Sequence, residues 1–151
     1  MSTDKTAQVQ KIMTALPLQT APPTASVKEI AEQMNAHKKG AIVIVDAQNR
    51  PLGIITERDI VRRVVAEGRD PVRVTALDVM SHPVISVDPD VSIYNAALVM
   101  TKYKIRRLPA VRDNVLHGIV TATDLARYLY EKNKQDPTLQ AMSRFSLIEH
   151  A

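Results

Sequence analysis

Hydrophobic positions follow two different spacings along the chain, and the same order of spacings occurs twice. Apolar residues recur every three or four positions after Ser26 and after Asp90, which is typical of amphipathic helices that begin near those residues. Each helical pattern is followed by two short apolar runs with a polar turn between them, which predicts β-hairpins over 41–55 and 108–120. A second helical pattern follows each hairpin. The predicted unit is therefore β-α-β-β-α.

The residues themselves repeat as well as the pattern. With an offset of 66, residues 17–34 lie over 83–100, and prolines, a serine, an alanine and a methionine coincide. A one-residue deletion in the following turn then brings "GIITERDI" onto "GIVTATDL". Two units, roughly 12–66 and 78–131, cover most of the chain. We interpret the sequence as an internal duplication in which neither half forms a sufficient core alone.

The second hairpin strand and the helix after it keep the same three residue types in both copies. These are Gly53, Thr56 and Asp59 in the first copy and Gly118, Thr121 and Asp124 in the second. A glycine lets backbone pass close to a neighbour or a ligand. A threonine and an aspartate at a helix start can cap the helix, or they can offer a hydroxyl and a carboxylate to a ribose. The residues alone leave both interpretations open.

The repeat resembles a pair of CBS domains, the tandem regulatory module named after cystathionine β-synthase and also called a Bateman module. The resemblance is carried by "SVKEIAEQM", "GAIVIVD" and "PLGIITERDI", and by "DVMSHPVISVDPDVSIYNAALVM", "KIRRLPAVRD" and "LHGIVTATDL". It implies an α/β fold of tandem βαββα repeats with pseudo-two-fold symmetry, two small sheets packed together and helices outside. We expect repeat 1 at 8–67, a linker at 68–76, repeat 2 at 77–132 and a tail with a short helix at 133–151.

The resemblance also implies a sensor that binds an adenosine-containing ligand in clefts between the repeats: AMP, ADP, ATP, S-adenosylmethionine or NAD. The family's ribose-binding aspartate maps onto Asp59 and Asp124, and its phosphate-binding arginine maps near Arg106. The implied nucleotide-binding residues are, in the second repeat, Thr121, Thr123, Asp124, Arg106, Arg107, Val84 and Ile85 and, in the first repeat, Thr56, Arg58, Asp59, Leu18 and Gln19. The first repeat has Gly40 and Ala41 at the arginine positions. We therefore expect tighter binding at Asp124.

Composition narrows the alternatives. The net charge is +4, which is compatible with nucleic-acid binding. The chain has only four tyrosines and one phenylalanine, however, and this does not favour a surface on which bases stack. No cysteine is present and the four histidines lack ligand spacing, so we expect no metal and no cofactor. Phosphate-binding glycine loops and a nucleophile elbow are absent, and we expect no enzymatic activity.

The chain shows no apolar run long enough to cross a bilayer and no secretory signal, so we expect a cytoplasmic protein without membrane contact. A homodimer is expected through apolar residues of the helices that follow the hairpins: Ile60, Val64, Leu125 and Leu129. Ligand binding would then be signalled to a separate effector protein, whose identity the sequence does not give. Two alternatives stay open, namely a nucleic-acid-associated protein and a ligand-free dimerisation module. The tail helix is expected to be amphipathic through Leu139, Met142, Phe145 and Leu147.

Overall fold

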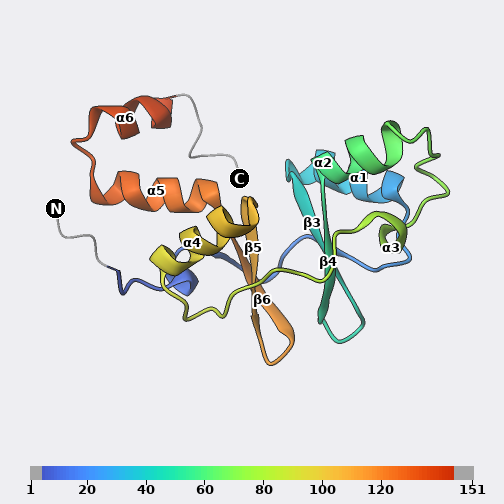
Figure 1. The fold of residues 1–151 in the computed structure, drawn as a ribbon, viewed down its shortest axis with the longest axis horizontal. Helices are drawn as coiled ribbons and strands as arrows, with labels where there is room; N and C mark the ends of the chain where they lie inside the picture. Colours follow the sequence, from blue (N-terminus) through green and yellow to red (C-terminus); the bar gives the residue numbers. More distant parts are fainter. Residues whose placement is uncertain (1–4, 145–151) are drawn as a thin grey trace. The chain divides into compact units, whose positions relative to one another are not determined.

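The computed structural model describes residues 5–144, which form two compact units (Figure 1). The first-repeat unit consists of Pro17–Ile85 and the hairpin turn Asp113–Leu116. Within the described residues, the second-repeat unit consists of 5–16, Ser86–Arg112 and 117–144. The leading segment is thus grouped with the repeat that is distant from it in sequence.

The first-repeat unit contains a three-stranded sheet with the strand order β2-β3-β4. Its strands are β2 (Thr20–Ala21), β3 (Ala41–Val45) and β4 (Pro51–Thr56), of which β2 is parallel and β4 antiparallel to β3. Its helical elements are α1 (Val27–His37), α2 (Glu57–Ile60), the π-helical turn η2 (Val61–Val65) and α3 (Ala76–Val79).

The second-repeat unit contains a three-stranded sheet with the order β1-β6-β5. Its strands are β1 (Thr14–Ala15), β5 (Arg107–Arg112) and β6 (Val115–Thr121). Its helical elements are the 3₁₀ turn η1 (Val9–Lys11), α4 (Ile93–Tyr103), α5 (Ala122–Lys132) and α6 (Pro137–Arg144). Two small three-stranded sheets with helices confirm the predicted α/β class.

The first helix of each repeat is delimited in the same way. The hydroxyl oxygens of Ser26 and Ser92 accept hydrogen bonds from the amide three residues later, at 3.1 and 3.0 Å. Both helices end at a lysine in the left-handed conformation, with φ of 53° at Lys38 and 55° at Lys104. The expected start near Asp90 was wrong by two residues, because the amide of Asp90 donates to the Asp88 side chain in a turn and Ser92 provides the cap.

Each sheet is completed by the segment that precedes the other repeat. Ser81 forms an antiparallel bridge with Ile54 of β4, through hydrogen bonds of 2.9 and 3.1 Å. In the second-repeat unit, β1 pairs with β6 so that Thr14 lies opposite Ile119. The strings "MS" at 80–81 and "MT" at 13–14 hold corresponding places in the two units, so the structural equivalence extends into both leading segments.

The recurring glycine is explained by these crossings. A Cβ atom at Gly53 would lie 2.5 Å from the sulfur of Met80 and 2.9 Å from the carbonyl oxygen of Ser81. A Cβ atom at Gly118 would lie 2.7 Å from the sulfur of Met13 and 2.8 Å from the carbonyl oxygen of Thr14. These distances are too short for any side chain. The glycine is therefore required by a neighbouring backbone segment in both repeats.

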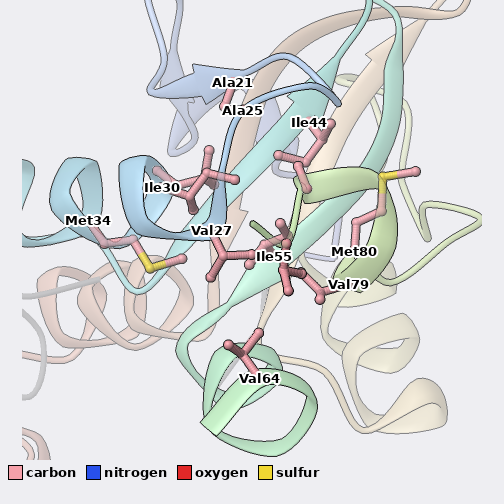
Figure 2. Close-up of a cluster of buried hydrophobic side chains, with 13 residues drawn as sticks. Ala21, Ala25, Val27, Ile30, Met34, Ile44, Ile55, Val64, Val79 and Met80 are labelled. Carbon is pink, nitrogen blue, oxygen red and sulfur yellow. The ribbon is translucent and has the colours of Figure 1, made fainter. Parts of the chain in front are cut away.

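The core of the first-repeat unit lies between its sheet and its helices, as Figure 2 shows. Val64 belongs to this core with 1% of its surface exposed, so its expected place on a dimer surface was wrong. The reason is the π-helical turn, in which the amide of Ala66 donates to the carbonyl of Val61 five residues earlier. The altered period leaves Val61 and Val65 exposed, at 58% and 68%, instead of Val64.

A helix is present in the tail, where α6 packs beside α5 (Figure 1). Leu139 and Met142 of α6 are half-buried. Phe145 and Leu147, which the sequence analysis placed on the same apolar face, lie outside the described residues.

Candidate functional site

Thr121 and Asp124 form a reciprocal cap at the start of α5. The amide of Thr121 donates to Oδ2 of Asp124 at 2.8 Å, and the amide of Asp124 donates to Oγ1 of Thr121 at 3.1 Å. Both side chains are nearly buried, with 7% and 4% exposed. Such a capping box satisfies two amides that the helix itself cannot satisfy. Capping alone therefore accounts for one oxygen of the Asp124 carboxylate.

The same arrangement occurs in the first repeat and once more outside the repeated motif. The amide of Thr56 donates to Oδ2 of Asp59 at 2.9 Å. In α3, the amide of Thr75 donates to Oδ2 of Asp78 at 3.0 Å, and this bond holds the pKa of the Asp78 carboxyl below its usual value. The string "TALD" at 75–78 carries this signal in the sequence. A threonine–aspartate pair is thus first of all a helix start in this protein.

The two motif aspartates differ at the oxygen that does not take part in the cap. Oδ1 of Asp124 accepts a hydrogen bond from Nη1 of Arg127 at 3.0 Å. Oδ1 of Asp59 accepts one from the hydroxyl of Ser81 at 3.2 Å and lies 3.8 Å from Nε of Arg63. The sequence analysis missed these three partners. Helical spacing from the aspartates could have identified the two arginines, but no local signal marks Ser81.

Arg106 lies beside the first turn of α5. Its carbonyl oxygen accepts from the amide of Ala122 at 2.8 Å, as that of Gly40 does from the amide of Glu57 at 3.1 Å in the first-repeat unit. Arg106 is exposed, and Arg107, the first residue of β5, is half-buried. The backbone thus brings the predicted arginine positions next to the start of the motif helix in the second repeat.

The other predicted residues are distributed over both units. Thr123 is half-buried in the first turn of α5, and Arg58 is exposed in the first turn of α2. Leu18 and Gln19 belong to the unit that contains Thr56 and Asp59, and the side-chain oxygen of Gln19 accepts from Gln33 at 3.0 Å. Val84 and Ile85 belong to the first-repeat unit and not to the unit of Asp124. Their role at the second site stays a prediction.

Neither metal ligation nor membrane insertion is indicated by the described part of the chain. Within residues 5–144, no group of three histidine, cysteine, aspartate or glutamate side chains is placed to hold a metal ion. No helix in the same range is long and apolar enough to span a bilayer.

The sequence profile of the CBS domain matches residues 9–66 and 76–131. The chain belongs to the CBS domain family. CBS domain proteins are generally regulatory or signal-transduction modules that bind small ligands and oligomerise, and they typically bind no cofactor. The identity of the fold and the repeat of the domain are thereby confirmed.

Relatives and solved structures agree with this membership. An uncharacterised protein of Methanopyrus kandleri is 48% identical over 107 residues, which are 70% of this chain but only 55% of that protein. The crystal structure of Hypoxic Response Protein I with two coordinated zinc ions matches with a TM-score of 0.74 at 32% identity, over 81% of this chain and 98% of that one; the protein of that name in the sequence comparison comes from Mycobacterium tuberculosis.

A solved structure with bound small molecules is similar over the same region. The CBS domain pair of protein MJ0100, in complex with 5′-methylthioadenosine and S-adenosyl-L-methionine, matches with a TM-score of 0.76 at 31% identity. The match covers 83% of this chain and 98% of that chain.

Proposed function

We propose that this CBS pair is a ligand-sensing regulatory module that binds an adenine nucleotide or adenosyl compound (AMP, ADP, ATP, S-adenosylmethionine or NAD). The observation that carries the proposal is the Asp124 carboxylate, which uses one oxygen for its cap and places the other at the start of α5. Arg106 lies beside the same helix start. The adenosyl compounds bound by the related CBS pair support the choice of ligand class.

In this proposal each chemical group of the ligand has its own partner. A carboxylate can accept hydrogen bonds from the two neighbouring hydroxyls of a ribose, which is the role of Asp124 and, in the first repeat, of Asp59. The planar guanidinium groups of Arg106 and Arg107 match phosphate oxygens. The adenine ring contacts the backbone near 84–85 or 18–19, as the family resemblance implies.

The module is proposed to act without catalysis, as a cytoplasmic homodimer that signals to a separate protein. Leu129 of α5 is 43% exposed, whereas Leu125 is half-buried. Together with Val61 and Val65 of η2, these residues leave apolar surface on the helices that follow both motifs. Sedimentation at micromolar concentration tests the dimer, and a mass of 16.7 kDa, that of one chain, would contradict it.

A ligand-free dimerisation module is the second candidate function. It is favoured by the third threonine–aspartate pair, Thr75 and Asp78, which makes the same cap outside the repeated motif. If capping were the whole purpose of the motif, the aspartates would need no ligand.

Thermal unfolding with added ligands distinguishes these functions. AMP, ADP, ATP, NAD and S-adenosylmethionine are each added at millimolar concentration, and the melting temperature is followed. A ligand that binds only the folded state raises the melting temperature. We expect a rise with at least one of them, and a smaller rise in Asp124→Ala. No rise with any compound supports the ligand-free module, and salt-sensitive binding of an oligonucleotide supports the nucleic-acid alternative.

A further inference from the structure

The Oδ1 oxygen of Asp124, which takes no part in the cap, is held by the Arg127 side chain. With only 4% of its surface exposed, Asp124 presents almost nothing to solvent. Its Oδ1 atom accepts the hydrogen bond from Arg127 at 3.0 Å, while the Arg127 side chain is 43% exposed. The arginine that holds this oxygen is therefore itself partly exposed to solvent.

In the first repeat the position that matches Arg127 is Arg62, and the arginine near the aspartate is the next residue, Arg63, which is held differently. Nη1 of Arg63 donates to the carbonyl oxygens of Val79 and Met80 at 3.0 and 3.3 Å, and its Nε lies 3.8 Å from Asp59. The hydroxyl of Ser81, on the crossing segment, occupies Oδ1 of Asp59 instead. Asp59 is thus covered by a neutral hydroxyl, and its arginine is anchored to backbone.

A ribose competes with Arg127 for the same oxygen. Oδ2 of Asp124 is engaged in the cap, so the ligand hydroxyls need Oδ1, which the guanidinium occupies. Because the carboxylate is almost completely covered, the guanidinium has to move before a hydroxyl can approach. A hydrogen bond between two charged groups is stronger than one from a neutral hydroxyl, so this exchange is unfavourable for an uncharged nucleoside.

We propose that Arg127 determines ligand specificity at the Asp124 site, by excluding uncharged nucleosides and favouring nucleotides that carry a phosphate. The inference rests on the proposed function and, of the ligands proposed there, selects AMP, ADP, ATP and NAD over S-adenosylmethionine, which carries no phosphate. Arg127 lies one turn into α5, so the displaced guanidinium stays tethered near the site after it leaves Asp124. A phosphate supplies the negative charge that the guanidinium has lost, and a nucleoside does not.

Calorimetric titration with AMP and with adenosine tests this inference. All proteins carry Asp59→Ala, so that the heat reports the Asp124 site. We expect Arg127→Met to bind adenosine about tenfold more tightly than the parent, which corresponds to the loss of one charge-assisted competitor. The affinity for AMP is expected to stay about the same, because the loss of the competitor is offset by the loss of a partner for the phosphate, so the preference for AMP over adenosine falls by about tenfold.

The matched control is Lys132→Met, which removes the same charge from the last turn of the same helix. It is expected to leave the preference for AMP unchanged, whereas Arg127→Lys retains most of that preference. Arg127→Gln gives the same comparison if the methionine variant does not fold. An unchanged preference in Arg127→Met and Arg127→Gln, with AMP binding intact, overturns the inference alone. If the chain without Asp59→Ala binds neither compound, nor any other nucleotide, the proposed function fails and the inference fails with it.

Discussion

The two repeats share a backbone plan and differ in the side chains around it. Helices α1 and α4 have 11 residues each, begin after a serine and end at a left-handed lysine. On the exposed face of α1, Lys28 and Glu32 form an ion pair at 2.7 Å. The equivalent positions of α4 carry Tyr94 and Leu98, which are 46% and 50% exposed. The two copies thus share the residues that set the backbone and differ in the residues on the exposed surface.

The leading segments show the same division. Both cross their sheet with a methionine packed on the glycine. The segment before the second repeat begins α3 with the Thr75–Asp78 capping box. The described part of the leading segment, residues 5–16, has no such box before its 3₁₀ turn η1, whose N-cap Gln8 makes no side-chain cap. The two repeats therefore share the crossing of the methionine over the glycine, but they do not share the helix that precedes it.

The largest effect is expected where the two repeats are most alike. Gly53→Ala and Gly118→Ala each place a Cβ atom within 3 Å of a methionine sulfur and a backbone carbonyl. We expect each to lower the free energy of unfolding by about 2–3 kcal/mol, measured by urea denaturation. Gly68→Ala is the control: its φ of 65° strains an alanine but its surroundings are open, so about 1 kcal/mol is expected. Equal losses at all three glycines would contradict the crossing as the cause.

Ligand affinity is expected to separate the repeats. Asp124→Ala should remove the tighter phase of nucleotide binding, a loss of about 1.5–3 kcal/mol or ten- to a hundredfold, because Arg106 and Arg107 accompany Asp124. Asp59→Ala should spare that phase. Calorimetric titration of both variants decides the question. Equal losses, or a larger loss in Asp59→Ala, would show that the two sites do not differ as proposed.

Substitution of two threonines distinguishes a role in helix capping from a role in ligand binding. Thr75→Ala and Thr121→Ala each remove an N-cap, and each should lower the free energy of unfolding by about 1 kcal/mol. Only Thr121→Ala should also weaken nucleotide binding, because Thr75 lies outside the repeated motif. The measurements are urea denaturation and calorimetry on the same samples. If the two variants bind nucleotide equally well, Thr121 has a capping role alone.

The smallest effect concerns an acidic turn that the first repeat lacks. Arg112 donates a hydrogen bond to Asp88 at 2.6 Å, which holds the pKa of the Asp88 carboxyl well below its ordinary value near 4. A lowered folded-state pKa contributes stability above the unfolded pKa, and this stability is lost as the pH falls through the folded value. Asp88→Asn should therefore flatten the acid side of the stability profile below about pH 5. An unchanged slope between pH 5 and 2 would exclude a contribution from this pair.

Most of the local structure could be predicted from the sequence, because local elements depend on residues three or four positions apart. The offset of 66 revealed the duplication, and the spacing of apolar residues revealed the helices and the hairpin of each unit. The strand predicted at the start of the second repeat is reduced to a single parallel bridge between Val87 and Ala110. Ser26 was recognisable as a cap, and so was the pairing of threonine and aspartate in the motif. The start of α4 was misplaced only because Asp90 and Ser92 are both good caps, and a turn engages Asp90.

The tertiary structure decided which distant segments meet. Sequence alone marked Gly53 as a point of close approach, but only the fold showed that Met80 fills the space above it. The hydroxyl on Asp59 comes from Ser81, 22 residues away, and the burial of Val64 follows from a π-helical turn. Such contacts depend on the path of the backbone and on packing against residues that are not neighbours in the sequence. The residue pattern within one helix or strand does not determine that path, so it cannot predict which distant segments meet.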